Sequence, residues 1–240
     1  MRTEFKCLHS GKCCEKVYTQ ISLTLGDIIR IAHFLDWPVE KLFEQNIVGI
    51  KPFGVSENVF EYELGLTIPC KFRINKRCKI YEARPLNCRL FPYWLLAEVS
   101  QEKIKKLIDK SYECVHSVKL NEETKTKYRQ YKDKIVEILN KEAEVTDRIL
   151  EKHKLKYLVD ISKQKGFEEV LDEIKQLEKR FPGIELQKAI DGVKISFAIR
   201  LLDKSKYKSL GKAIVKEIKN ANLEASSTSL DGLRFIEAII

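Results

Sequence analysis

The chain has 240 residues, of which 44% are hydrophobic and 33% charged, and its formal net charge at pH 7 is +9. This is the composition of an ordinary globular protein, and no apolar run approaches the roughly 20 residues that a membrane-spanning helix needs. Lys and Arg exceed Asp and Glu in both halves of the chain. We therefore interpret the basic residues as part of solvent-exposed helix faces, with a nucleic-acid-binding surface as the alternative.

Two helices are predicted near the start of the chain. Thr24, followed three residues later by Asp27, indicates a capping box at a helix N-terminus. Apolar residues then recur at helical spacing as far as Leu35. Pro38 suits the first position of a second short helix, because its missing N–H needs no partner there.

The middle of the chain mixes strand and helix signals. Residues 59–64 alternate apolar and polar side chains, which predicts a strand. Residues 91–100 and 103–108 predict a hairpin, with a helix as the alternative for the second arm.

The second half of the chain, which contains no cysteine, predicts a bundle of helices. Asn121 suits an N-cap, so we place a domain boundary there, between residues 1–119 and 120–240. Five stretches of this half show apolar residues at helical spacing: 128–139, 167–181, 186–201, 207–218 and 230–239. The expected fold is mostly α with a small β component, a cysteine-rich α+β metal-binding domain followed by an all-α bundle of unknown role.

All seven cysteines lie between Cys7 and Cys114. Because no apolar stretch before Cys7 could form a secretory signal, we expect a cytoplasmic protein. Cysteines seldom persist as disulfides in that reducing compartment, although hyperthermophile proteins are an exception. We therefore favour metal ligation over disulfides.

The first cysteine group contains Cys7, Cys13 and Cys14. Gly11 allows a backbone with positive φ, so Cys7 and Cys13 can turn toward one metal ion. Adjacent cysteines usually project in different directions, so one of Cys13 and Cys14 is expected to serve a second metal or the wall of the site. His9 lies inside this group and is a candidate ligand or hydrogen-bond donor to a ligand.

The second group contains Cys70, Cys78 and Cys88. Seven Lys or Arg residues and one Glu accompany them between residues 70 and 92. Several thiolates form an anionic site, and flanking cations such as Arg84 and Arg89 lower thiol pKa values and offset that charge.

The last candidates are Cys114 and His116, although a single Cys-x-His is a weak signal by itself. The chain has neither a classical zinc-finger nor a ferredoxin spacing. Seven soft ligands suit zinc and an iron–sulfur cluster equally, so the residues leave the metal open.

At these residues the sequence resembles the CxxCxxCC cysteine-cluster family, described as zinc- or iron-chelating, with the signature Phe-x-Cys-x-x-Cys-Gly-x-Cys-Cys. The resemblance covers about residues 5–116 and implies a zinc or iron–sulfur site held by the cysteines. The matching positions are Phe5, Cys7, Gly11, Cys13 and Cys14, then 21–24 with Asp27 and Arg30, and the segment 78–92.

One position departs from the signature, because Ser10 stands where the family has its second cysteine. His9 replaces the missing ligand, Ser10 itself approaches the metal, or one coordination position is open. An open position would favour chemistry over a purely structural site.

The family includes the flagellin lysine N-methylase, but this chain has no glycine-rich nucleotide-binding motif. We therefore weigh three functions. The first is an iron–sulfur oxidoreductase or protein-modifying enzyme with a protein substrate or redox partner. The second is a zinc-stapled module that binds RNA or a protein, and the third is a protein that chelates and delivers iron or zinc.

Overall fold

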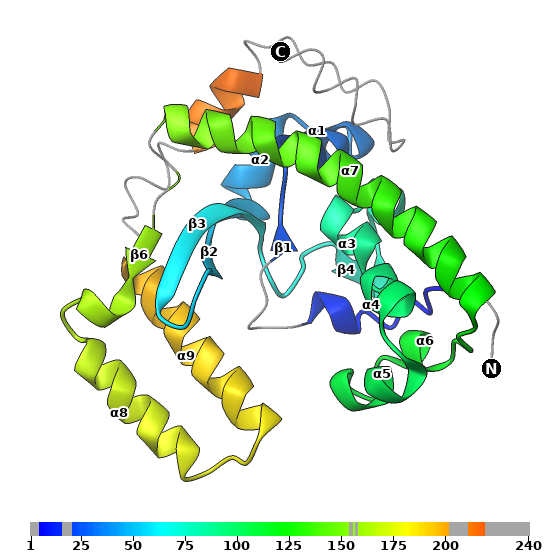
Figure 1. The fold of residues 1–240 in the computed structure, drawn as a ribbon. Coiled ribbons are helices and arrows are strands. Elements are labelled where there is room, and N and C mark those ends of the chain that lie inside the picture. Colours follow the sequence, from blue (N-terminus) through cyan, green and yellow to red (C-terminus); the bar gives the residue numbers. More distant parts are fainter. Residues whose placement is uncertain (1–4, 16–20, 154–155, 157, 202–210, 219–240) are drawn as a thin grey trace.

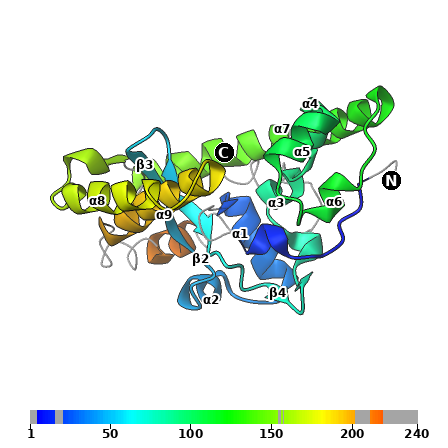
Figure 2. The same ribbon diagram turned by 90° about the horizontal axis from the view of Figure 1, so that it is seen from below.

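The computed structural model describes residues 5–15, 21–153, 156, 158–201 and 211–218. The fold is mostly helical with a small sheet, as predicted, and helix α7 (Glu122–Lys152) spans the molecule (Figures 1 and 2). The sheet, α8 and α9 lie toward one end of α7, and α4 to α6 lie toward the other. The remaining α-helices are α1 (Leu25–Phe34), α2 (Val39–Glu44), α3 (Leu86–Leu90), α4 (Tyr93–Glu98), α5 (Gln101–Leu107), α6 (Glu113–His116), α8 (Phe167–Glu178) and α9 (Ile184–Leu201).

Strand β3 (Val59–Leu66) forms the centre of the sheet and confirms the predicted strand. It pairs antiparallel with β2 (Val48–Gly54), while β1 (Ile21–Ser22) and β6 (Leu158–Asp160) pair with its two ends. The prediction that residues 120–240 are all helical is therefore wrong at β6. A strand of three residues is too short to show alternation, and it forms because a distant strand supplies its hydrogen bonds.

The start of α1 agrees with the sequence prediction. The hydroxyl of Thr24 accepts the N–H of Asp27 at 3.0 Å, and the Asp27 carboxylate accepts the N–H of Thr24 at 3.2 Å. This reciprocal capping box satisfies two N–H groups that the helix cannot pair internally. Pro38 precedes α2 as its N-cap.

The predicted hairpin over residues 91–108 is wrong, because this segment forms the two short helices α4 and α5. The alternative of a helix for the second arm, residues 103–108, is confirmed by α5. The hydroxyl of Ser100 caps α5 by accepting the N–H of Lys103 at 3.3 Å. The apolar residues that suggested a strand instead form one core cluster with Tyr128 of α7, in which Leu96 and Ile104 are fully buried. Tertiary packing has here overridden a local alternating pattern.

Helix α7 begins where the sequence indicates but runs much further than residues 128–139. The Asn121 side chain accepts the N–H of Thr124 at 2.8 Å, and the Thr124 hydroxyl accepts the N–H of Asn121 at 3.0 Å. Helices α8 and α9 confirm the next two predicted stretches, and residues 211–218 are helical. The stretch 230–239 lies outside the described residues.

Apolar clusters join residues from both sides of position 120. Leu86 packs with Ile135 and Ile138 of α7, and Phe60 packs with Phe197 of α9. The division into domains at residues 1–119 and 120–240 stays a prediction.

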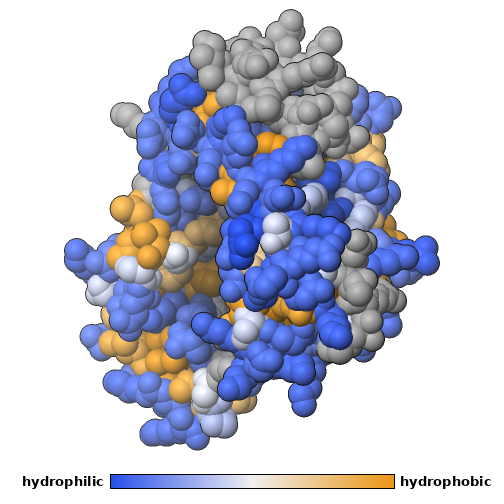
Figure 3. Space-filling view, turned by 45° about the vertical axis from the view of Figure 1, so that its right-hand side comes forward, coloured by the Kyte–Doolittle hydropathy of each residue, from blue (hydrophilic) through white to orange (hydrophobic). Residues whose placement is uncertain are grey.

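The surface seen in Figure 3 is mostly hydrophilic, with hydrophobic residues in a recess near the middle of that face. Among the described helices, none combines the length and the apolar character needed to cross a membrane.

Candidate metal centre

The cysteine segments, far apart in sequence, meet at the N-terminal segment. The backbone N–H of Cys70 donates to the carbonyl of Cys14 at 2.9 Å, which joins the first and second groups. The Tyr112 hydroxyl reaches the carbonyl of Lys12 at 3.4 Å, near the start of α6, which carries Cys114. All seven cysteines are free thiols, so the disulfide alternative is wrong for this structure.

One cavity of about 500 Å³ collects these thiols. Its wall includes all seven cysteines, Cys7, Cys13, Cys14, Cys70, Cys78, Cys88 and Cys114. His9, Ser10 and Arg84 line the same cavity. As the side chains stand, no three His, Cys, Asp or Glu residues of the described segments form a set that could hold a metal ion. The soft sulfur donors suit zinc and iron, but they are arranged around a space rather than around one point.

The first group lies on a tight turn. Gly11 has the positive φ that the sequence indicates, 73°, and His9 also has a positive φ of 54°. The short 3-10 helix η1 (Lys12–Cys14) follows, with the sulfur atoms of Cys13 and Cys14 only 3.9 Å apart. The expectation that these neighbours point apart is wrong, because the 3-10 turn brings both side chains to the cavity.

The second group is carried by a small hairpin and a short helix. Strands β4 (Arg73–Ile74) and β5 (Arg77–Cys78) pair antiparallel. The turn between them places Asn75 and Lys76 at positive φ, as two-residue hairpin turns require. The 3-10 helix η2 (Tyr81–Ala83) and helix α3 follow, and α3 carries Cys88.

Burial is the main influence on the thiols of Cys78, Cys88 and Cys114. It raises the pKa of each one above the ordinary value, and the negative charges of neighbouring cysteines raise it further. A hydrogen bond with Cys14, and then burial, raises the pKa of Cys13, while Arg84 lowers it. These thiols are therefore protonated in the metal-free protein at neutral pH, and a metal must displace their protons.

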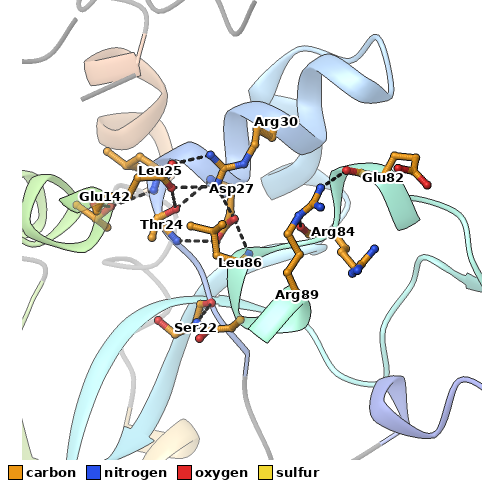
Figure 4. A network of polar contacts seen from close by, with 12 residues as sticks. Ser22, Thr24, Leu25, Asp27, Arg30, Glu82, Arg84, Leu86, Arg89 and Glu142 are labelled. Atoms are coloured by element: carbon orange, nitrogen blue, oxygen red, sulfur yellow. Dashed lines mark hydrogen bonds and ion pairs between the residues drawn. The ribbon is translucent and has the colours of Figure 1, made fainter. Parts of the chain in front are cut away.

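The predicted accessory residues occupy different places. The guanidinium of Arg84 lies 3.9 Å from the ring centre of Tyr81 at the cavity wall. Arg89 lies outside the cavity lining; its guanidinium donates to the carbonyls of Arg84, at 3.1 Å, and of Glu82, which fixes this loop (Figure 4). His116 also lies outside the lining, with Nε2 3.0 Å from the carbonyl of Ile108.

A comparison with protein families gives one match over this region. Residues 6–115 match the family CxxCxxCC, described as a "putative zinc- or iron-chelating domain". The match covers 110 of the 240 residues and places a CxxCxxCC domain in this part of the chain. All seven cysteines lie within the matched CxxCxxCC domain, and chelation of zinc or iron is the property that the family's description names. No solved structure matches the chain.

The position that lacks a cysteine in this CxxCxxCC domain lies at the cavity. Ser10 and His9 both line it, and the imidazole of His9 packs 4.7 Å from the Tyr81 ring, centre to centre. The backbone N–H of His9 donates to the sulfur of Cys7 at 3.4 Å. Whether either side chain reaches a metal stays a prediction.

Sequence reasoning missed several residues that build the CxxCxxCC site. Tyr81 supports both His9 and Arg84, and Lys76 reaches the cavity from the hairpin turn. The Asn87 side chain donates to the carbonyl of Ser22 at 2.9 Å and so fixes the turn before Cys88. The position of Asn87 next to Cys88 was the available sequence signal, because a side-chain contact with a distant backbone carbonyl leaves no periodic pattern.

Proposed function

We propose that the CxxCxxCC domain holds an iron–sulfur centre through cysteines from all three segments. The observation that carries this proposal is the convergence of seven thiols on one cavity of about 500 Å³. A structural zinc ion is closed by four ligands, which would leave three of the seven thiols without a metal. A centre of several metal atoms uses more of these donors, and thiolates are the usual ligands of iron–sulfur clusters.

Electron transfer is the role that we propose for such a centre. One electron would arrive from a reduced donor protein and leave to an oxidised acceptor protein, while no covalent bond of the chain changes. The exposed position of Cys13 supports this role, because a partner could approach that side of the site. The other cysteines are half-buried or buried, which limits access of water.

Purification without oxygen, followed by metal and sulfide analysis and an absorption spectrum, tests the proposal. We expect bound iron and acid-labile sulfide, with a broad absorption band near about 400 nm. A colourless protein with stoichiometric zinc and no sulfide would contradict it.

The β4–β5 hairpin favours a second candidate, a zinc-stapled module that binds an anionic partner such as RNA. Lys76, Arg77 and Lys79 are exposed, and no ion pair to any of them occurs within the described segments. By contrast, Arg73 pairs with Glu15 at 2.5 Å. Unpaired cations on one small element are the feature that phosphate backbones attract.

RNA titrations at several salt concentrations test this candidate. We expect affinity that falls with salt and falls further when Lys76 and Arg77 are changed to Glu. Lys105→Glu with Lys106→Glu on the exposed side of α5 is the matched control and should bind as the wild type does. Absence of binding at low salt would exclude the candidate.

A further inference from the structure

Helix α7 lies entirely outside the family segment 6–115, yet it contacts that segment beside its cysteines. The hydroxyl of Tyr128 accepts the N–H of Phe5 at 2.7 Å, one residue before that segment begins and two residues before Cys7. Tyr128 also belongs to the apolar cluster that contains Cys114. Ile135 and Ile138, further along α7, pack against Leu86, two residues before Cys88.

A buried ion-pair chain continues this row of contacts on α7. Glu142 is completely buried and pairs with Arg30 of α1 through both carboxylate oxygens, at 2.5 and 2.9 Å (Figure 4). Arg30 also donates to Asp27 at 2.7 Å. The Thr24 hydroxyl donates to Glu142 at 2.5 Å, so the carboxylate is held by both the side chain and the cap of α1.

The series of buried ion pairs ends at α3, the short helix that carries Cys88. The same oxygen of Asp27 that binds Arg30 accepts the backbone N–H of Leu86, the first residue of α3, at 2.9 Å. Helix α3 has five residues and Pro85 as its N-cap, so it has no capping side chain of its own. A helix this short depends on outside contacts, and Asp27 supplies an acceptor for its N-terminal N–H.

Helices α1 and α7 pack closely against each other where the buried ion pair joins them. A Cβ on Gly26 would lie 2.3 Å from a carboxylate oxygen of Glu142, so only glycine allows the two helices this approach. The hydroxyl of Thr146, one turn beyond Glu142, accepts the N–H of Leu25 at 3.0 Å. Both oxygens of a buried carboxylate are thus engaged in a single arrangement, and removal of its charge would leave Arg30 only partly compensated.

From these contacts we infer that Glu142 is a positioning residue for the metal site. It fixes α1 through Arg30, and α1 fixes α3 and Cys88 through Asp27. The inference rests on the proposed function, because it assumes that Cys88 is a metal ligand. It assigns part of the metal affinity to a helix that the family segment does not include.

Zinc competition against a chelator tests the inference, with zinc as the probe because thiolates bind it without added sulfide. We expect Glu142→Gln to lose zinc at a roughly tenfold lower chelator concentration than the wild type, while its far-ultraviolet circular dichroism is unchanged. Glu137→Gln is the matched control, since Glu137 lies on the exposed side of α7 and, within the part of the chain that the structure describes, its ion pair is with Lys141. It should retain zinc as the wild type does.

The outcomes separate the two proposals. A wild type that binds neither zinc nor iron with sulfide would overturn the proposed function and this inference together. A wild type that binds zinc and a folded Glu142→Gln variant of equal affinity would overturn the inference alone.

Hydrogen exchange on the wild-type protein provides a test that needs no variant. If α7 positions the site, metal binding must in turn stabilise α7, because coupling between two sites is reciprocal. We expect amides around residues 138–146 to exchange roughly tenfold more slowly after zinc loading. Slower exchange in α3 with no change in α7 would overturn the inference. If the Glu142→Gln variant fails to fold, this exchange experiment on the wild type is the deciding test.

Discussion

Gly11 lies directly against the side chain of Arg73: a Cβ on Gly11 would be 2.1 Å from Nε of Arg73. The guanidinium of Arg73 pairs with Glu15 at 2.5 Å, one residue after the adjacent cysteines. Gly11 therefore has two roles in the first cysteine group. Its φ of 73° forms the turn. Its missing side chain makes room for Arg73, which extends from the β4–β5 hairpin and holds the first cysteine segment through Glu15.

Gly11→Ala should destabilise the protein and weaken metal binding. An alanine at this φ costs about 1–2 kcal/mol, and the overlap with Arg73 adds to that cost. Urea unfolding of the metal-free protein measures the loss of stability, and chelator competition measures the loss of affinity.

Gly183→Ala is the control for this prediction. Gly183 has a φ of 65°, but nothing lies within 4 Å of the position that its Cβ would take. Gly183→Ala should therefore lower the free energy of unfolding only by the cost of an alanine at positive φ, and its metal affinity should equal that of the wild type. Equal effects of the two substitutions would contradict the role assigned to the contact with Arg73.

Local signals predicted the helix starts well and the tertiary contacts poorly. Thr24 and Asn121 were recognisable as caps, because a capping box is a short pattern that depends on neighbouring residues. Strand β6 and helix α4 were not predicted, and α5 was expected only as an alternative to a strand, because their stability comes from β3 and from α7, which lie far away in sequence. A pattern within one segment carries no information about such partners.

The sequence could predict that the cysteines come together, which the cavity confirms, but not which residues hold their segments in place. The cysteines were interpreted as one group because several cysteines close together in half of a chain favour metal ligation over isolated buried thiols. Glu142 was not identified, because a single glutamate in a charged helix is indistinguishable from a surface residue until Arg30 is placed beside it. The cavity shape likewise depends on turns such as Asn75–Lys76 that no spacing rule specifies.

Ser10→Cys, which places a cysteine at the second cysteine position of the signature that residues 5–14 resemble, should increase metal retention. Ser10 already lines the cavity, so a thiol there adds a soft donor without moving the backbone. Chelator competition and the metal-to-protein ratio measure the effect. Ser10→Ala should match the wild type if the hydroxyl is no ligand, and a variant Ser10→Cys with unchanged retention would show that this position cannot reach the metal.

The metal-free protein should lose stability as the pH rises above about 8. Burial raises the pKa of Cys88 and Cys114, and that of Tyr93 to about 12. The folded state therefore keeps these protons at pH values where the unfolded chain, with pKa values of about 8.5 for Cys and 10 for Tyr, has released them. Since the unfolded state then binds fewer protons, the free energy of unfolding falls as the pH rises.

Urea unfolding near pH 7.5 and near pH 9.5, with a reductant and a chelator present, checks this dependence. We expect a lower midpoint at the higher pH. The metal-loaded protein should show a smaller decrease, because its cysteine ligands have already lost their protons. A midpoint of the metal-free protein that rises between these pH values would contradict the assignment.

The central claim is that cysteines from separate segments hold one shared centre, and the metal content of Cys70→Ser and Cys114→Ser tests it most directly. These cysteines come from the second and third groups, and both line the same cavity. If the centre is shared, each variant purified without oxygen should lose most of the metal that the wild type retains, and should also lose stability. If each variant instead loses a separate fraction, or none, the cysteines do not form one centre.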